Sequence, residues 1–271
     1  MRLILTDLDG TLIDHHTYSA EAARPALAAA RVAGVPIVPC SSKTLAEMRQ
    51  LAVGLDLAPA PLIVENGGAI WFPQQWPHLP HGVVAGIDGG AVLVLGARAE
   101  WLRPRLALVA AATGLTVRGF TEMSEAEVAT RTGLPPAAAA MARQRQFSEP
   151  FVCEAGAPDL LALDAAARQV GARVTRGGRF FHLTGPSDKG AAVRVVLATG
   201  AHRSRSLGLG DAPNDLPLLQ AVDDPVIVPQ PSGLHPDLLQ ALPAAMHAPS
   251  PGPTGWNAVV LRWLSATTDH G

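Results

Sequence analysis

The first part of the chain alternates short apolar segments with longer helical ones, and this alternation constrains the fold more than any other feature. The apolar segments have the length and composition of buried strands. In order, the predicted elements are a strand at Arg2–Thr6, a helix at Ala20–Ala33, a strand at Val35–Cys40, a helix at Thr44–Gly54 and a strand at Pro61–Val64. Strands that alternate with helices pair in parallel. We therefore predict an α/β fold with a doubly wound, Rossmann-like parallel-sheet core.

The alternation stops in the middle of the chain and returns near residue 186. The middle region indicates a compact α+β insert, with strands at Ala91–Leu95, Phe151–Glu154 and Phe180–Thr184 and helices at Trp101–Thr113, Glu125–Thr132 and Leu160–Val170. After it come a helix that opens at Asp188, a strand at Ser206–Leu209 and a last helix at Trp256–Leu264. Residues 230–253 are rich in proline and are predicted to form loops. We predict a core of residues 1–81 and 186–271 and an inserted domain at 82–185.

The composition excludes several classes of protein. Of the 271 residues, 48% are hydrophobic and 16% are charged, which allows a sizeable packed core. The net charge of −2 provides no basic surface for nucleic acid or for an anionic membrane. Cys40 and Cys153 form no CxxC pair, which favours a reducing compartment, and Asp7 and Asp9 interrupt any signal-peptide pattern. We predict a cytoplasmic protein with no nucleic-acid or membrane partner.

Two carboxylates stand at the end of the first strand, with one residue between them. Asp7 follows the apolar run directly, and Gly10 allows the backbone to turn so that Asp7 and Asp9 can face one cavity. An aspartate carboxylate can attack a phosphoryl group and form an aspartyl-phosphate, while a second carboxylate carries the proton. The alternative interpretation is an Asp-Gly turn in which one acid caps a helix.

Two lysine-containing segments are also suited to phosphate chemistry. Ser41 and Lys43 open a helix, where free backbone N–H groups bind anions. Lys189 lies at the start of another helix, where its charge is unfavourable to the helix dipole and therefore suggests a charge-neutralising task. Taken alone, the first segment is more simply explained as a plain helix cap and the second as carrying a solvated lysine.

The loop at Gly210–Asp215 is the clearest later signal. It places Asp211 to share a hard divalent cation such as Mg²⁺ with Asp7, because Mg²⁺ prefers oxygen ligands from one or two carboxylates. Asn214 and Asp215 would hold the ligands in place. Ligands of open α/β sheets bind beyond the carboxyl ends of the strands, which is where all of these segments are expected.

Motifs of other phosphate-binding and metal-binding folds are missing: the sequence has no GxxxxGK, no GxGxxG after the first strand, no HExxH and no CxxC. Four motifs instead resemble, in order, those of the haloacid dehalogenase-like phosphatases: DLDGT at 7–11, Ser41, Lys189 and GDAPND at 210–215. The resemblance implies that Asp7 is the nucleophile and that Asp9 is the general acid and then the base. It also implies that Mg²⁺ binds the Asp7 side chain, the Asp9 carbonyl and Asp211, and that phosphoryl oxygens bind Ser41, Lys43 and Lys189.

The insert resembles the cap of the sugar-phosphatase branch, and finer motifs resemble the family of mannosyl-3-phosphoglycerate phosphatases. These motifs are CSSKT at 40–44, ENGG at 65–68, RTGL at 131–134, RQFSEPF at 145–151 and GGRFFH at 177–182. This narrower resemblance implies release of mannosylglycerate, a compatible solute, from its phosphomonoester. Because that leaving group carries a carboxylate, we expect a bidentate arginine in the cap. Arg145 and Arg179 are the candidates, and the alternative for each is a surface arginine on a cap helix. His182 is a further candidate, and Glu65 and Asn66 could bind sugar hydroxyls.

Several alternatives stay open at this level. A related sugar phosphatase could act on glucosyl-3-phosphoglycerate or a hexose phosphate, and a phosphomutase could share the fold. A non-catalytic binding protein is disfavoured because the acidic residues and the lysine of the motifs are all present. The expected ligand is a small phosphorylated sugar acid, and the expected assembly is a monomer or homodimer. The cap is expected to open at hinges near His81 and Thr184.

Overall fold

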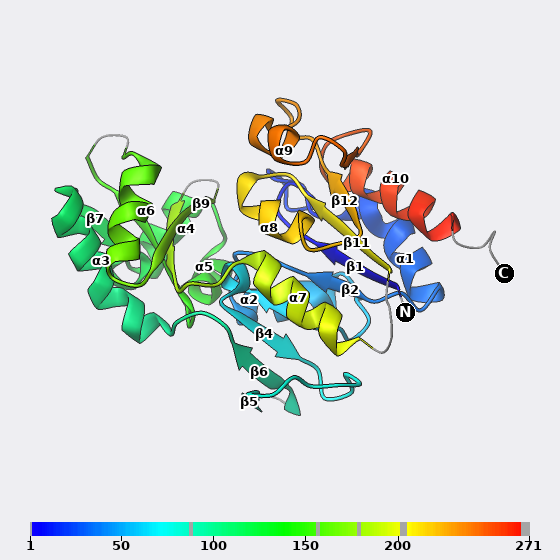
Figure 1. Ribbon diagram of the computed structural model, residues 1–271, viewed down its shortest axis with the longest axis horizontal. Coiled ribbons are helices and arrows are strands. Elements are labelled where there is room, and N and C mark those ends of the chain that lie inside the picture. The colour runs from blue at the N-terminus through cyan, green and yellow to red at the C-terminus, as the bar shows by residue number, and fades with distance from the viewer. Residues whose placement is uncertain (1, 87–88, 156–157, 178–179, 201–204, 267–271) are drawn as a thin grey trace.

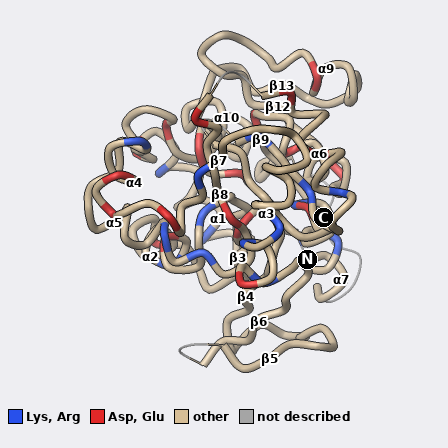
Figure 2. Tube along the Cα trace, turned by 90° about the vertical axis from the view of Figure 1, so that its left-hand side faces the viewer, with Lys and Arg blue, Asp and Glu red and all other residues tan. Residues whose placement is uncertain are grey.

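The protein has two bodies (Figure 1). The computed structural model describes residues 2–86, 89–155, 158–177, 180–200 and 205–266. The first and last segments of the chain form a core around a parallel sheet, and the middle segment forms a smaller cap beside it. Charged residues of both signs are interspersed over both bodies (Figure 2). Within the described ranges, no helix is long and apolar enough to cross a bilayer.

The core sheet is parallel and is built from both ends of the chain. Its strands, in spatial order, are β13 (Met246–His247), β12 (Asp224–Ile227), β11 (Arg205–Gly210), β1 (Arg2–Thr6) and β2 (Ile37–Pro39). Thr6 pairs in register with Pro39 on one side and with Leu209 on the other, so β1, β2 and β11 end at the same edge. The predicted parallel α/β core is confirmed.

Helices cover both faces of this sheet. One face carries α1 (Arg24–Val32), α2 (Leu45–Gly54) and α10 (Gly252–Ser265), and the other carries α7 (Lys189–Thr199), α8 (Leu216–Leu219) and α9 (Pro236–Ala241). Because both faces are covered, β1 is apolar along most of its length instead of alternating with polar residues. Trp256 of α10 is fully buried, and its indole N–H donates to Thr6 Oγ1 at 3.0 Å. This bond fixes the last residue of β1.

A smaller antiparallel sheet begins at the edge of the core. Its strands, in spatial order, are β3 (Leu62–Val64), β4 (Ala69–Phe72), β6 (Ala91–Val94) and β5 (Val84–Ala85). The predicted insert begins at residue 82, but β6 pairs with β4 and β5 pairs with β6, so both strands belong to this sheet. The chain therefore leaves the sheet after Val94 instead of at His81. We propose that the cap covers residues 96–185.

The cap is a four-stranded antiparallel sheet with helices on both faces. Its strands, in spatial order, are β7 (Val117–Gly119), β8 (Ser148–Cys153), β10 (Phe180–Thr184) and β9 (Arg173–Gly177). Its helices are α3 (Ala99–Thr113), α4 (Glu125–Thr132), α5 (Pro136–Ala142) and α6 (Leu160–Gln169). α3 and α6 cover one face. α4 and α5 cover part of the other face, and the remainder lines a cavity shared with the core.

Some elements differ from those predicted, for local reasons. The proline-rich residues 230–253 contain α9 and β13, and Pro236 occupies the first turn of α9, where proline is tolerated. β4 was not predicted, and neither were β7 and β9, which carry arginines and too few apolar residues to indicate a strand. α3 begins at Ala99 instead of Trp101.

A left-handed turn, residues 65–67, follows β3 and packs against α7. Glu65, Asn66 and Gly67 have φ angles of 50°, 58° and 84°, an unusual conformation for the two residues with side chains. A methyl group at Gly67 would lie 2.2 Å from the carbonyl oxygen of Asp188 and 2.9 Å from the nitrogen of Lys189. The start of α7 therefore packs directly on this turn, and only glycine fits at position 67.

Gly67→Ala should destabilise the protein by roughly 3 kcal/mol, because left-handed strain and overpacking against α7 act together. Gly34→Ala is the matched control, since Gly34 has a φ of 63° but nothing within 4 Å of an added methyl group. We expect that control to cost only about 1 kcal/mol. Urea unfolding measures both, and equal losses would show that the packing of Gly67 on α7 does not matter.

Candidate active site

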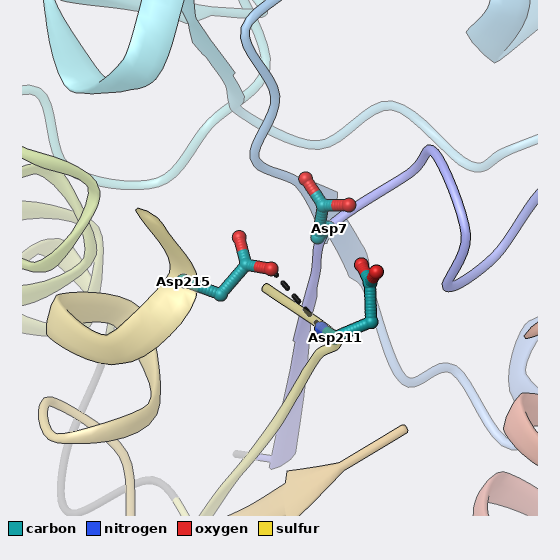
Figure 3. A group of neighbouring side chains, drawn as sticks. All are labelled: Asp7, Asp211 and Asp215. Atoms are coloured by element: carbon teal, nitrogen blue, oxygen red, sulfur yellow. Dashed lines mark hydrogen bonds between the residues drawn. The ribbon is translucent and has the colours of Figure 1, made fainter. Parts of the chain in front are cut away.

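Three buried carboxylates meet where β1 and β11 end (Figure 3). Asp7 follows β1, Asp211 follows β11, and Asp215 lies in the 3-10 turn η5 (Pro213–Asp215) that precedes α8. Oxygens of the three side chains lie within 4.8 Å of one another. The parallel pairing of β1 with β11 brings them together, because both strands end at the same edge of the sheet.

Lys189 is the cation of this group. It lies in the first turn of α7, and its Nζ is 2.6 Å from Asp7 Oδ1 and 2.6 Å from Asp215 Oδ1. The side chain is 1% exposed. Burial lowers the pKa of Lys189, but Asp215 and Asp7 outweigh burial and hold the pKa well above its usual value. The lysine therefore keeps its charge although its side chain is buried.

The group has more negative charge than Lys189 neutralises. Burial raises the pKa of Asp7 well above its usual value, Asp215 raises it further, and Lys189 offsets only part of this. Burial and Asp215 likewise raise the pKa of Asp211 to about 7. A set of oxygen ligands with excess negative charge suits a hard divalent cation such as Mg²⁺. The residues present therefore fit the predicted magnesium site.

Backbone and side-chain hydrogen bonds lock the acidic loop. Asp215 Oδ2 accepts from the N–H groups of Asp211 and Ala212, each at 3.1 Å. Asp211 accepts from the Thr11 hydroxyl at 3.1 Å and from Gln230 Nε2 at 3.0 Å. Thr11 belongs to the DLDGT motif but was not singled out, and nothing in the sequence pointed to Gln230. Both were missed because their partner comes from a distant part of the chain.

Asp9 and Lys43 form a second ion pair beside the acidic group. Lys43 Nζ lies 2.9 Å from Asp9 Oδ1 and 2.8 Å from Oδ2. Burial lowers the pKa of Lys43, but Asp9 and Glu47 raise it above its usual value. The Lys43 ammonium also lies 5.4 Å from the centre of the Tyr18 ring. The Lys43 ammonium and the Asp9 carboxylate therefore form a close ion pair near the end of β1.

A cavity of about 840 Å³ separates these groups from the cap. Its wall includes most of the predicted site residues, namely Asp7, Asp9, Lys43, Arg145, His182, Asp211 and Asn214. Lys189 and Asp215 lie directly behind this wall. Lys189 contacts both Asp7 and Asp215. Ser41 is fully buried, and its neighbours Ser42 and Lys43 line the cavity in its place.

Two neighbouring polar side chains of the cap wall lack partners. Thr175 of β9 and His182 of β10 are opposite each other in the sheet, and both line the cavity. Thr175 Oγ1 and His182 Nδ1 are buried and have no hydrogen-bond partner among the described residues. Burial, with the positive charges of Arg145 and Lys189, lowers the pKa of His182 to about 3, so its ring is neutral. Thr175 stands in no motif, so the sequence did not point to it.

Arg145 connects the cap to the core. It lines the cavity, its Nε donates to the carbonyl of Ala142 at 2.7 Å, and another guanidinium nitrogen donates to the carbonyl of Ser42. A third guanidinium nitrogen lies 3.8 Å from Glu47. Much of its hydrogen-bonding capacity is therefore used within the protein. Its predicted contact with a substrate carboxylate stays a prediction, and Arg179 lies outside the described residues.

Glu65 and Asn66 do not line the cavity. The Glu65 carboxylate is 1% exposed and accepts three hydrogen bonds from cap residues 146–148. Burial raises its pKa, although Arg145 and the Ser148 hydroxyl lower it. This position does not support the predicted contact of Glu65 with sugar hydroxyls, because its oxygens already bind the cap. Asn66 Oδ1 is buried and has no partner within the described part of the chain.

Comparison with known proteins agrees with this geometry. Residues 4–79 match the family model of the haloacid dehalogenase-like hydrolases. The chain is 36% identical to a glucosyl-3-phosphoglycerate/mannosyl-3-phosphoglycerate phosphatase of Methanococcoides burtonii, over 96% of each chain. It is 34% identical to one of Persephonella marina, over 97% of each. The solved structure of the phosphatase BT1666 from Bacteroides thetaiotaomicron has a TM-score of 0.68 at 15% identity and covers 98% of this chain and 95% of its own.

The chain belongs to the haloacid dehalogenase-like hydrolases. It is a phosphoric monoester hydrolase with a Rossmann-like core and a cap. In this hydrolase, the carboxylates and lysines of the core gather at the predicted edge of the sheet. The specific role of each site residue stays a prediction.

Asp215→Asn should lower the turnover number by about a hundredfold or more, because an amide cannot both pair with Lys189 and accept from the two loop N–H groups. Asp223→Asn is the matched control. Asp223 accepts from the N–H and hydroxyl of Ser206 at the far end of β11, away from the site. Hydrolysis of an aryl phosphate measures both, and similar turnover numbers would contradict the importance of Asp215.

The neutral His182 should make stability depend on pH. Its pKa is about 3 when folded, and the ring titrates near 6.5 when unfolded. Below pH 6.5 the unfolded chain therefore binds a proton at His182 that the folded protein does not bind. The contribution of His182 to the free energy of unfolding is thus complete above pH 6.5 and is lost as the pH falls toward 3. Between pH 7 and pH 5 we expect His182 to account for a loss of about 2 kcal/mol.

Urea unfolding of the wild type and His182→Asn at these two pH values measures this loss. The variant cannot titrate at this position, so its free energy of unfolding should fall less steeply with acid. Identical pH slopes for the two proteins would contradict the neutral, buried state of His182.

Proposed function

We propose that this hydrolase removes the phosphate from mannosyl-3-phosphoglycerate, and from its glucosyl counterpart, with Mg²⁺ and through an aspartyl-phosphate. The observation that carries the proposal is the 36% identity, over 96% of the chain, to a relative named for these two substrates. The acidic group, its buried lysine and the large cavity beside it support the same reaction. The product would be the compatible solute mannosylglycerate.

Asp7 and Asp9 divide the chemistry in this mechanism. The Asp7 carboxylate attacks the phosphorus, the bond from phosphorus to the leaving oxygen breaks, and Asp9 gives that oxygen a proton. Water then attacks the phosphorus, Asp9 takes a proton from the water, and the bond between phosphorus and Asp7 breaks. Phosphate leaves and both carboxylates return to their first state. Lys43 touches Asp9 and faces the cavity, so it is placed to hold phosphoryl oxygens near the proton donor.

The magnesium ligands in this proposal are Asp7, Asp211 and the backbone carbonyl of Asp9. When bound, the ion supplies the positive charge that the acidic group lacks and that the phosphoryl group needs. Asp215 orients the backbone of Asp211, and Thr11 orients its carboxylate. Lys189, which does not line the cavity, offsets the negative charge of Asp7. These residues are held before substrate arrives, so little rearrangement is needed during attack.

The cap wall supports a polyhydroxylated leaving group. Much of the wall is apolar, with Phe120, Leu134 and Phe180 among its residues. Within it, Thr175 Oγ1 and His182 Nδ1 have no partner in the described part of the chain, and each could bond a sugar hydroxyl. Because His182 is neutral, this part of the wall suits hydroxyls better than a second phosphate. The cap also excludes water from the carboxylates during attack.

Other enzymes of this fold remain as competing functions. A hexose phosphate phosphatase or a phosphomutase would use the same core residues, and a phosphomutase would return the phosphoryl group to a sugar instead of to water. The proposed setting is the cytoplasm, in keeping with the free thiols of Cys40 and Cys153. The assembly stays a prediction of a monomer or homodimer.

A phosphate-release assay should separate these functions. The substrates are mannosyl- and glucosyl-3-phosphoglycerate, mannose and glucose phosphates and p-nitrophenyl phosphate, each with Mg²⁺ and with EDTA. We expect the glycosyl-phosphoglycerates to give the highest kcat/KM and EDTA to abolish turnover. Asp7→Asn should lose turnover by at least about a thousandfold, because an amide is a poor nucleophile.

Asp56→Asn is the control for that variant, because Asp56 pairs with Arg31 on the exposed surface. It should keep the wild-type rate. Faster turnover of simple hexose phosphates would overturn the proposed substrate. Full activity in EDTA would overturn the role of the metal, and full activity of Asp7→Asn would overturn the mechanism.

A further inference from the structure

Glu65 is a buried carboxylate that the proposed chemistry does not use. Its Oε1 accepts from the N–H of Gln146 at 2.9 Å. Its Oε2 accepts from the N–H of Phe147 at 3.0 Å and from the hydroxyl of Ser148 at 2.6 Å. All three donors belong to one segment, residues 146–148, which leads into β8 of the cap. Hydrogen bonds to a carboxylate are among the strongest in proteins, so this is a firm attachment.

The same cap segment packs into the core. Phe147 is 2% exposed and belongs to the apolar cluster of the core face that carries α1 and α10. A methyl group at Gly68 would lie 2.7 Å from Phe147 Cβ, so the segment rests directly on the backbone after Glu65. This noncovalent attachment joins the cap to the core away from the two places where the chain crosses between them. It adds to the contacts of Arg145 with Ser42 and of Thr44 with the carbonyl of Met141.

The turn that carries Glu65 also contacts the loops of the active site. The N–H of Glu65 donates to the carbonyl of Lys43 at 3.0 Å, and the N–H of Asn66 donates to the carbonyl of Ser41 at 2.9 Å. Gly67 packs on the start of α7, and Lys189 is the first residue of that helix. Two residues with side chains hold a left-handed conformation here, which persists only where the surroundings enforce it.

The chain crosses between core and cap twice, near residue 96 and near residue 185. The first crossing contacts the turn, and the second contacts the first. The N–H groups of Leu95 and Gly96 donate to the carbonyl of Gly68 at 3.0 and 2.9 Å. A methyl group at Gly185 would lie 2.3 Å from the nitrogen of Ala97, so the two passages cross in contact. Residues 65–68 therefore contact three parts of the protein. These are the loop that carries Ser41 and Lys43, the start of α7, and residues 95–96, where the chain enters the cap.

We propose that Glu65 is a positioning residue that holds the cap wall at a fixed place over the catalytic carboxylates. Its attachment sets the start of β8, and β8 pairs with β10, where Pro150 is opposite His182. The attachment also sets Arg145, which directly precedes the attached segment and reaches the carbonyl of Ser42. The inference rests on the proposed function, because it concerns a substrate large enough to contact both bodies.

Loss of the carboxylate should affect large and small substrates differently. The bonds from the turn to Ser41 and Lys43 come from the backbone, so a side-chain change leaves them in place. The cap wall, in contrast, loses part of the attachment that residues 146–148 make to Glu65. Because a misplacement of about 1 Å can cost about a hundredfold in rate, substrates that contact the cap should suffer most.

Glu65→Gln tests this, because the amide keeps the size of the side chain but offers one acceptor oxygen instead of two. Glu149→Gln is the matched control. Glu149 is also 1% exposed, and it accepts from the N–H and hydroxyl of Thr121 and pairs with Arg103, so its partners all lie within the cap. Both variants should lose stability, but only Glu65→Gln should disturb the join between cap and core.

The measurement is kcat/KM for the best large substrate of the wild type, divided by that for p-nitrophenyl phosphate. We expect Glu65→Gln to lower this ratio by about tenfold or more and Glu149→Gln to leave it unchanged. Amide hydrogen exchange should speed up at Gln146 and Phe147 in Glu65→Gln only. An equal ratio in both variants would overturn the proposal and leave Glu65 with a purely structural role.

Ser148→Ala removes only the 2.6 Å bond to Glu65 and covers the case in which Glu65→Gln does not fold. It should lower the same ratio by about threefold to tenfold, and an unchanged ratio would again overturn the proposal. The test is separable from the proposed function. If the wild type prefers a different large sugar phosphate, the proposed substrate is wrong, but the ratio measured with that sugar phosphate still decides the role of Glu65.

Discussion

The position of Lys189 between Asp7 and Asp215 is the interaction on which the active site depends. A buried ammonium ion is stable only when carboxylates and hydrogen bonds replace its water, and this one has a carboxylate on each side at 2.6 Å. The arrangement joins three parts of the chain: the end of β1, the start of α7 and the turn before α8. Any change in the packing of these elements therefore changes the charge balance at Asp7.

The same charge balance explains why a metal ion suits the site. One lysine faces three carboxylates, and burial makes the excess charge costly, as the raised pKa values of Asp7 and Asp211 show. A divalent cation would relieve this repulsion and present positive charge to a phosphoryl group at the same place. The residues to which we assign the chemistry therefore all belong to the core. The cap adds a second wall to the cavity, in which Thr175 Oγ1 and His182 Nδ1 have no partner among the residues that the structure describes.

The local sequence indicated the position of a site residue wherever one short motif contains both the backbone turn and the charged side chain. Asp7, Asp9, Lys189, Asp211 and Asp215 could be predicted because each lies at a strand end or a helix start within a recognisable motif. Thr11, Gln230 and Thr175 were not singled out, because their significance depends on a partner or a cavity supplied by a distant segment. The later start that we propose for the cap, after residue 82, has a similar reason. β5 and β6 resemble the start of a new unit in sequence, but their pairing with β4 places them in the sheet next to the core.

Glu65 shows the limit of motif-based reasoning most clearly. Its place after β3 suggested a contact with substrate, whereas the structure attaches its carboxylate to the cap. The sequence by itself determined the α/β core and the order of the acidic and lysine-containing motifs, because apolar periodicity and acidic strand ends act locally. The resemblance of those motifs to a known family indicated the class of reaction. Only the tertiary structure decided which residues share the cavity, where the cap begins and what Glu65 binds. These depend on strand pairing and on contacts between segments far apart in the chain, which local sequence does not encode.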